Sequence, residues 1–305
     1  MGLEADLLLD RRRLKRRLGF WRALTVLGIC AAIGLGFWRG AAPGSGAHVA
    51  RLSVAGIILD DRKLDRKIAK LADDPSVKAL ELYIDSPGGS VAGGEALHDA
   101  IALVASRKPV VAVMGGLAAS AGYMIAVPAE RIFCREGTLT GSIGVLLEAP
   151  EFSGLLGKVG VQVQTLVSGP LKGQPSLTAP LSPEGRQVLQ GLVADMYDQF
   201  VAMVAAGRHM DPAKVRELAD GRAYTGRQAL QLGLVDAIGG ETEARGWLAT
   251  AKRVSADLPT RDVEEGGLAR RLFFGDFDGV LSSVLKIFFS QWLTLDGPWA
   301  LWQGK

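Results

Sequence analysis

The sequence is poor in the residues that most often mark metal sites and disulfide frameworks. Its 305 residues include only two cysteines, Cys30 and Cys134, and three histidines. Cys30 lies inside a long apolar run and Cys134 in the body of the chain, so we expect no disulfide between them. His48, His98 and His209 are far apart in sequence and lack the short spacing of metal ligands. We therefore predict no metal and no cofactor.

A general excess of basic charge is also lacking. The formal net charge is only +3, and six of the seven residues in "RRRLKRR" (11–17) are basic. Without this cluster the rest of the chain is slightly acidic, which gives little support to nucleic-acid binding. We therefore expect no nucleic-acid partner.

The basic cluster is followed by an apolar run that predicts a single transmembrane anchor. Residues 23–38 contain no charged side chain, and aromatic pairs flank the run as they do at membrane interfaces. Arg22 can extend its side chain to the headgroups and so lengthen the span. Because the basic residues come first, the N-terminus should be cytoplasmic and the rest of the chain extracytoplasmic (periplasmic). A cleavable signal peptide is the alternative, since "GSGA" (44–47) ends in a small residue.

Strand and helix patterns alternate along the body of the chain. Short apolar, β-branched runs predict strands, and amphipathic segments with Ser-Pro or Asp-Pro at their start predict helices. This alternation predicts an α/β domain with a largely parallel sheet. The expected strands are 49–58, 77–85, 109–116, 131–134, 141–147 and 161–167, and the expected helices are 61–72, 91–106, 182–207 and 211–220.

Composition divides the chain into five segments. They are a cytoplasmic basic segment (1–19), the anchor (20–39), a Gly/Pro-rich linker (40–48), the α/β domain (49–255) and an aromatic tail (256–305). In the tail, residues 280–295 carry apolar side chains on one helical face. This run is short for a span and has Lys286 in its middle, so we expect an amphipathic helix on the membrane surface. Packing on its own domain or on a partner subunit are the alternatives.

The stretch "GGLAASAGYMIA" (115–126) holds one hydroxyl, that of Ser120, among small residues after an apolar strand. A serine at a strand-to-helix turn can present its hydroxyl to a substrate. The following amide, that of Ala121, lies at the helix start, where N–H groups favour an anion. Taken alone, the pattern also fits an ordinary serine at the start of a helix.

A second stretch, "DSPGG" (85–89), predicts a tight turn with accessible glycine amides after the strand at 77–85. One of these amides, that of Gly88 or Gly89, could form an oxyanion hole together with the Ala121 amide. As a turn signal alone, this pattern is weak.

No histidine lies between Ala121 and Arg208 to serve as the base of a catalytic triad. His98 is one alternative, on the predicted helix 91–106. The loop "SGPLKGQPSL" (168–177) offers another, since it carries Lys172 among glycines and prolines. A lysine can act as general base when burial lowers its pKa from about 10.4 toward 7–8. A solvent-exposed loop lysine is the ordinary alternative.

Five motifs resemble, in order and spacing, the signal peptide peptidase A family of membrane-bound serine peptidases. They are "DSPGG", "GGLAASAGYMIA", "GSIGV", "SGPLK" and "GRAYTGRQALQLGLVDAIGG", and the resemblance covers about residues 49–250. It implies a ClpP/crotonase-like α/β fold, here behind the N-terminal transmembrane helix. It also implies a Ser/Lys dyad, with Ser120 as nucleophile and Lys172 as general base.

The same resemblance implies the supporting residues. Gly89 and the Ala121 amide would bind the oxyanion, with Gly88 as a possible substitute, and Ser168 would orient Lys172. Gly173 departs from the family, since many relatives carry an acidic residue there, which leaves substrate preference open. The chain is similar to the short, single-domain form of the family.

The resemblance finally implies a reaction and an assembly. The enzyme would degrade remnant signal peptides and other short hydrophobic peptides through an acyl-enzyme. Family members form ring-shaped homo-oligomers in which neighbouring protomers shape the substrate groove and in some cases share the dyad. The alternatives are a crotonase-type acyl-CoA enzyme, a non-catalytic membrane scaffold with the same fold, and a peptidase with a Ser/His/Asp triad.

Overall fold

The computed structural model describes residues 46–263. Most of the predicted linker, the predicted anchor (20–39) and the amphipathic run (280–295) lie outside the described residues. Within the described range, none of the helices combines the length and the apolar character that a membrane crossing requires.

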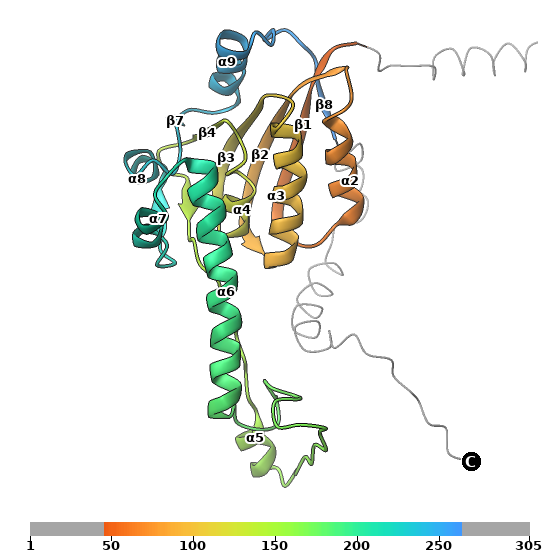
Figure 1. Ribbon diagram of the computed structural model, residues 1–305, viewed down its shortest axis with the longest axis vertical. Helices are drawn as coiled ribbons and strands as arrows, with labels where there is room; N and C mark the ends of the chain where they lie inside the picture. Colours follow the sequence, from red (N-terminus) through yellow and green to blue (C-terminus); the bar gives the residue numbers. More distant parts are fainter. Residues whose placement is uncertain (1–45, 264–305) are drawn as a thin grey trace, which may run out of the picture. The chain divides into compact units, whose positions relative to one another are not determined.

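A single sheet forms the centre of the described chain (Figure 1). Its strands are β1 (His48–Ile58), β2 (Val77–Gly89), β3 (Val110–Ala119), β4 (Arg131–Cys134), β5 (Leu139–Gly141), β6 (Ala223–Thr225), β7 (Ala237–Ile238) and β8 (Thr260–Asp262). The main path runs β6-β5-β3-β2-β1-β8, and β4 pairs with β3 and β7. The β1–β2, β2–β3, β3–β4, β3–β5 and β4–β7 pairs are parallel and β5–β6 is antiparallel, which confirms the predicted largely parallel sheet.

The helices of the described range are α2 (Arg62–Leu71), α3 (Val91–Ala105), α4 (Ala121–Met124), α5 (Ser153–Lys158), α6 (Pro183–Arg208), α7 (Pro212–Leu218), α8 (Gly226–Gln231) and α9 (Glu241–Lys252). Several of them pack on the sheet, whereas α5 has no buried residue. The α9 residues Ala244 and Leu248 form one core cluster with Val111 and Phe133 of the sheet. Successive strand residues point to opposite faces, so the fully buried Leu80, Leu82 and Ile84 face away from α9. The helix α3 contacts β2 as well as α2, and in Figure 1 α2 and α3 lie in front of the sheet.

Two strand predictions were wrong in the segment between β5 and α6. Residues 161–167 form no strand and are exposed, and of the strand expected at 141–147 only Gly141 belongs to a strand, the end of β5. The apolar alternation of these segments is real, but none of the described strands lies beside them to complete a ladder. We call residues 142–181 the extension.

The long helix α6 has the predicted start. The side chain of Ser182 accepts a hydrogen bond from Gly185 N at 2.9 Å, and Pro183 occupies the first turn. The apolar side chains in the first half of the helix do not lie in a core, since Val188 is 45% and Leu192 52% exposed. Phe200 and Val201, in the second half, are buried. Only the second half packs on the body of the domain.

Candidate active site

Ser120 adopts a backbone conformation that is rare for any residue except glycine. It lies between β3 and α4 with φ 55° and ψ −123°. Its N–H donates to Gly141 O at 2.9 Å, and its carbonyl accepts from Tyr123 N and Met124 N, each at 2.9 Å. Such backbone strain costs about 1–3 kcal/mol and is concentrated at active sites. The side chain is half-buried, and its hydroxyl has no hydrogen-bond partner among the described residues.

Gly88 lies directly against this serine. Its φ is +113°, and a Cβ at this position would stand 2.8 Å from Ser120 Cβ and 3.2 Å from Ala121 N. Any side chain here would therefore occupy the space beside the serine and the following amide. This contact brings the "DSPGG" and "GGLAASAGYMIA" motifs together, as their predicted common site requires.

The "DSPGG" segment differs from the predicted tight turn, because it continues β2 as far as Gly89, with one residue, Gly88, at positive φ. Ser86 holds this course. Its buried hydroxyl donates to Gly56 O at 2.6 Å and accepts from Gly88 N at 3.1 Å. Sequence reasoning missed this role of Ser86, although a serine just before Pro-Gly-Gly is a signal for side-chain bonding to the backbone.

The amide of Gly88 is therefore already engaged, which leaves that of Gly89 for an oxyanion. Ser90 N donates to Ile58 O of β1 at 2.9 Å. Successive amides of an extended strand point to opposite edges, so the Gly89 N–H points away from β1, toward the side of β3 and Ser120. A Cβ at Gly89 would stand 1.8 Å from Ile58 O, which explains why this position needs glycine.

The strain at Ser120 gives a stability prediction. Because glycine tolerates positive φ, Ser120→Gly should have a free energy of unfolding about 1 kcal/mol higher than that of Ser120→Ala, which keeps the strain. Chemical denaturation of the two variants measures this difference. If Ser120→Gly is equally or less stable than Ser120→Ala, the conformation at residue 120 is not strained.

The structure does not bring the predicted bases to Ser120 within one chain. Lys172 and Ser168 are exposed in the extension, and His98 interacts with its neighbour Asp99 (Nδ1 to Oδ1, 3.1 Å). Within residues 46–263, no hydrogen bond joins Ser120 to Lys172 or His98, or Lys172 to Ser168.

The helix α6 separates Lys172 from Ser120. Gln174, two residues after Lys172, has its side chain against Gly185 at the start of α6. A Cβ added at Gly185 would be 3.0 Å from Gln174 Oε1. At the other end, a Cβ at Gly207 would be 2.2 Å from Val127 Cγ1, close to the helix that follows Ser120. At 1.5 Å rise per residue the two contacts are about 33 Å apart along the helix.

Other candidate nucleophiles and ligands are few. Burial raises the pKa of the Cys134 thiol to about 11, so this cysteine is a protonated core residue rather than a nucleophile. In the part of the chain that the structure describes, no group of three His, Cys, Asp or Glu side chains is arranged to hold a metal ion.

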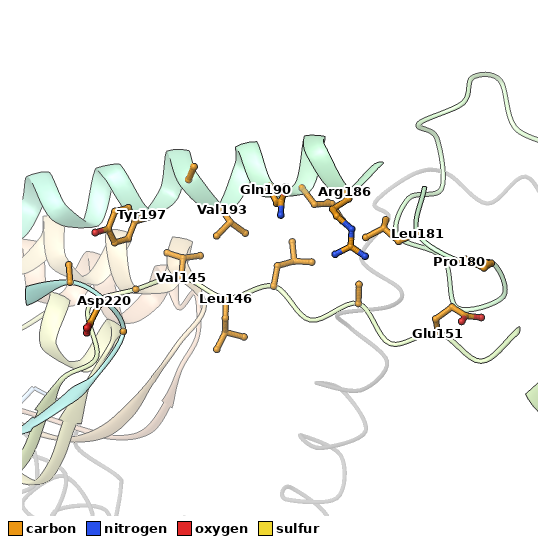
Figure 2. A pocket seen from close by; sticks show the side chains of 17 residues that line it. Val145, Leu146, Glu151, Pro180, Leu181, Arg186, Gln190, Val193, Tyr197 and Asp220 are labelled. Carbon is orange, nitrogen blue, oxygen red and sulfur yellow. The ribbon is translucent and has the colours of Figure 1, made fainter. Parts of the chain in front are cut away.

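An open groove of about 980 Å³ runs along the first part of α6 (Figure 2). One wall is α6, with Arg186, Val193 and Tyr197, and the other is the chain that leaves β5, with Val145 and Leu146. This wall begins at Gly144, three residues after Gly141, whose carbonyl accepts the hydrogen bond from Ser120 N. The lining is mostly apolar, with charges at Arg186, Glu151 and Asp220, so the groove suits an apolar chain segment.

Comparison with known proteins identifies the family. Residues 102–255 match Peptidase family S49. The chain belongs to this family. It is a serine endopeptidase related to signal peptide peptidase A, as the five motifs predicted. Residues 60–136 also match the Clp protease family, which confirms the predicted ClpP-like α/β fold.

The relatives of this S49 peptidase include two bacterial proteins and an archaeal one. A putative protease of Synechocystis is 42% identical over 75% of this chain and 83% of its own length. The putative signal peptide peptidase SppA of Enterococcus faecium is 36% identical over 69% of this chain and 65% of its own. A putative protease of Methanocaldococcus jannaschii is 36% identical over 74% and 75%, respectively. Among solved structures, a ClpP1 variant from Listeria monocytogenes is 17% identical, with a TM-score of 0.42 over 64% of this chain and 93% of that one.

Proposed function

We propose that this S49 peptidase is anchored in the cytoplasmic membrane and degrades remnant signal peptides and other short hydrophobic peptides with Ser120 as its nucleophile. The observation that carries the proposal is the strained Ser120, which lies against Gly88 and whose hydroxyl has no hydrogen-bond partner within residues 46–263. Family membership favours this peptidase over the acyl-CoA enzyme and the non-catalytic scaffold.

The proposed chemistry proceeds through an acyl-enzyme. Ser120 Oγ attacks the scissile carbonyl while Lys172 takes its proton, and the amides of Ala121 and Gly89 donate to the oxyanion. Collapse of this intermediate breaks the C–N bond, and the proton passes from Lys172 to the leaving amine. Water, deprotonated by Lys172, then hydrolyses the ester. Each oxyanion donor commonly contributes about 2.7–4 kcal/mol to transition-state stabilisation.

In this proposal Lys172 reaches Ser120 of a neighbouring subunit in a ring-shaped homo-oligomer. Two observations support this arrangement. Lys172 and Ser120 of one chain lie near opposite ends of α6, and the extension has an apolar surface. More than half of the exposed large apolar side chains in the described range lie between residues 146 and 171, and Leu166 is 98% exposed. A concentration of this kind is typical of a surface covered by a partner. Ser168 would then orient Lys172 inside the assembled site.

The substrate class can be tested with two matched peptides. Purified enzyme in detergent or vesicles should cleave a signal-peptide-like peptide with an apolar centre. It should spare a peptide of equal length in which the apolar residues are replaced by serine, because the groove beside α6 is lined mainly by apolar side chains. Equal cleavage of both peptides would contradict the proposed substrate class.

The membrane topology is a separate proposal, resting on the apolar run and on the basic cluster before it. A reporter that is active only outside the cytoplasm, fused after residue 48, should be active and should sediment with membranes. A fusion of the same reporter after residue 19, before the anchor, is the control and should be inactive. An inactive reporter in the fusion after residue 48 would contradict this topology. The tail helix at 280–295 would add a second contact with the same membrane surface.

A further inference from the structure

We propose that Tyr123 is a positioning residue for the reaction, because its phenol fixes the one-turn helix α4 that carries the Ala121 amide. The inference rests on the proposed roles of Ser120 and Ala121. It adds a residue that touches neither the substrate nor the nucleophile's hydroxyl.

The first observation is that α4 is too short to hold its own position. It has four residues, and an isolated helix of that length has no stability in water. Tyr123 is completely buried, and its own N–H donates to Ser120 O. Its hydroxyl donates to Leu234 O at 2.8 Å, across more than a hundred residues of sequence.

The second observation is that the accepting carbonyl belongs to a firmly held segment. Arg208, the last residue of α6, donates from Nε and Nη2 to Gly233 O at 3.1 and 3.0 Å. Its Nη1 and Nη2 also form a two-point ion pair with Asp236, at 3.0 and 2.7 Å. Asp236 Oδ2 in turn accepts from Ile132 N of β4 at 2.8 Å.

The Arg208 side chain of this pair is buried, at 8% exposed, and that of Asp236 is 28% exposed. Planar, two-point guanidinium–carboxylate pairs of this kind are geometrically stiff. Burial also raises the pKa of the Tyr123 phenol, so that the hydroxyl stays protonated and remains a donor wherever the enzyme is folded. Residues 233–236 are therefore fixed to β4 and to the end of α6, and the Tyr123 phenol in turn fixes α4 to these residues.

Loss of the hydroxyl should affect the transition state more than substrate binding. The ring of a phenylalanine would still fill the core, but α4 would lose its fixed point and Ala121 N could move relative to the oxyanion. Oxyanion donors act on charge that develops only during the reaction, so the loss should lower kcat and leave KM nearly unchanged.

The test compares two tyrosine-to-phenylalanine variants of the full-length protein. Tyr224 is the matched control, because it is also buried and its hydroxyl donates to a leucine carbonyl, that of Leu218, at 2.9 Å. We expect Tyr123→Phe to lower kcat and the rate of labelling by a fluorophosphonate probe by about tenfold, equivalent to about 1.4 kcal/mol. Tyr224→Phe should lose a similar amount of thermal stability and keep the labelling rate within about twofold.

Four results would contradict the inference or the proposal on which it rests. If both variants lose labelling rate equally, or if Tyr123→Phe labels as fast as the wild type, Tyr123 only stabilises the fold. If KM rises while kcat is unchanged, the residue acts on binding and the positioning role is wrong. Labelling of the wild type at a residue other than Ser120 would refute the proposed nucleophile itself, independently of Tyr123.

Discussion

Mixing the Ser120→Ala and Lys172→Ala variants should restore peptidase activity that neither variant has alone. Each single variant should lose activity by at least about a thousandfold, since nucleophile and base act as one unit, and the double variant should be no worse than either. In a mixed oligomer, a site can combine Ser120 of one copy with Lys172 of its neighbour. Random mixing of equal amounts should make about a quarter of the sites intact.

The measurement is hydrolysis of a fluorogenic peptide after the two variants are co-expressed or allowed to exchange subunits. The control replaces Lys172→Ala by the double variant, which lacks the nucleophile in every copy and should give no recovery. An inactive mixture with proven mixed oligomers would mean that Lys172 reaches Ser120 of its own chain. Substantial activity of Lys172→Ala, with His98→Ala inactive, would transfer the role of base to His98.

Gly88→Ala should lower activity by at least about a hundredfold, the range seen when an oxyanion donor is lost. The added methyl group would meet Ser120 Cβ at 2.8 Å and Ala121 N at 3.2 Å, and it would also disfavour the φ of +113°. To relieve this contact, either the new methyl group or Ser120 must move. The methyl group and the serine both border the space in which the reacting carbonyl has to bind, so either movement should lower activity. Hydrolysis of the peptide, with circular dichroism to monitor folding, measures the effect.

Gly160→Ala is the matched control for backbone strain. Gly160 also has a positive φ, +75°, but a Cβ there would meet no atom within 4 Å. Both variants are destabilised by a side chain at positive φ, whereas only Gly88→Ala adds a group next to Ser120. If the two variants lose similar activity, or if Gly88→Ala stays fully active, the space beside Gly88 is not used by the substrate.

The fold was largely predictable because its signals are local. The strands β1, β2 and β3 contain apolar or β-branched runs. Ser182 and Asp211 mark helix starts, since each side chain accepts a hydrogen bond from an amide two or three residues further on. The apolar residues of these elements are buried wherever a neighbouring strand or helix packs against them. In the extension the apolar residues at 161–167 stay exposed, since no strand of residues 46–263 pairs with them.

The candidate site was predictable in part for the same reason. Small residues around Ser120 and the Gly-Gly pair are local requirements for close approach, and the structure does bring these two motifs together. The extended course of Ser86–Gly89, held by Gly56 O, and the link from Tyr123 to Leu234 depend on residues distant in sequence. The position of Lys172 relative to a serine depends, in our proposal, on a second copy of the chain, so no pattern within one chain could specify it.

The most direct test of the central claim is to identify the residue that a fluorophosphonate probe modifies. Full-length wild-type protein should gain one probe per chain, and mass spectrometry of its peptides should place the adduct on Ser120. Ser120→Ala should gain none and should not cleave the apolar peptide. An adduct on another serine, or undiminished cleavage by Ser120→Ala, would contradict the assignment of Ser120 as the nucleophile.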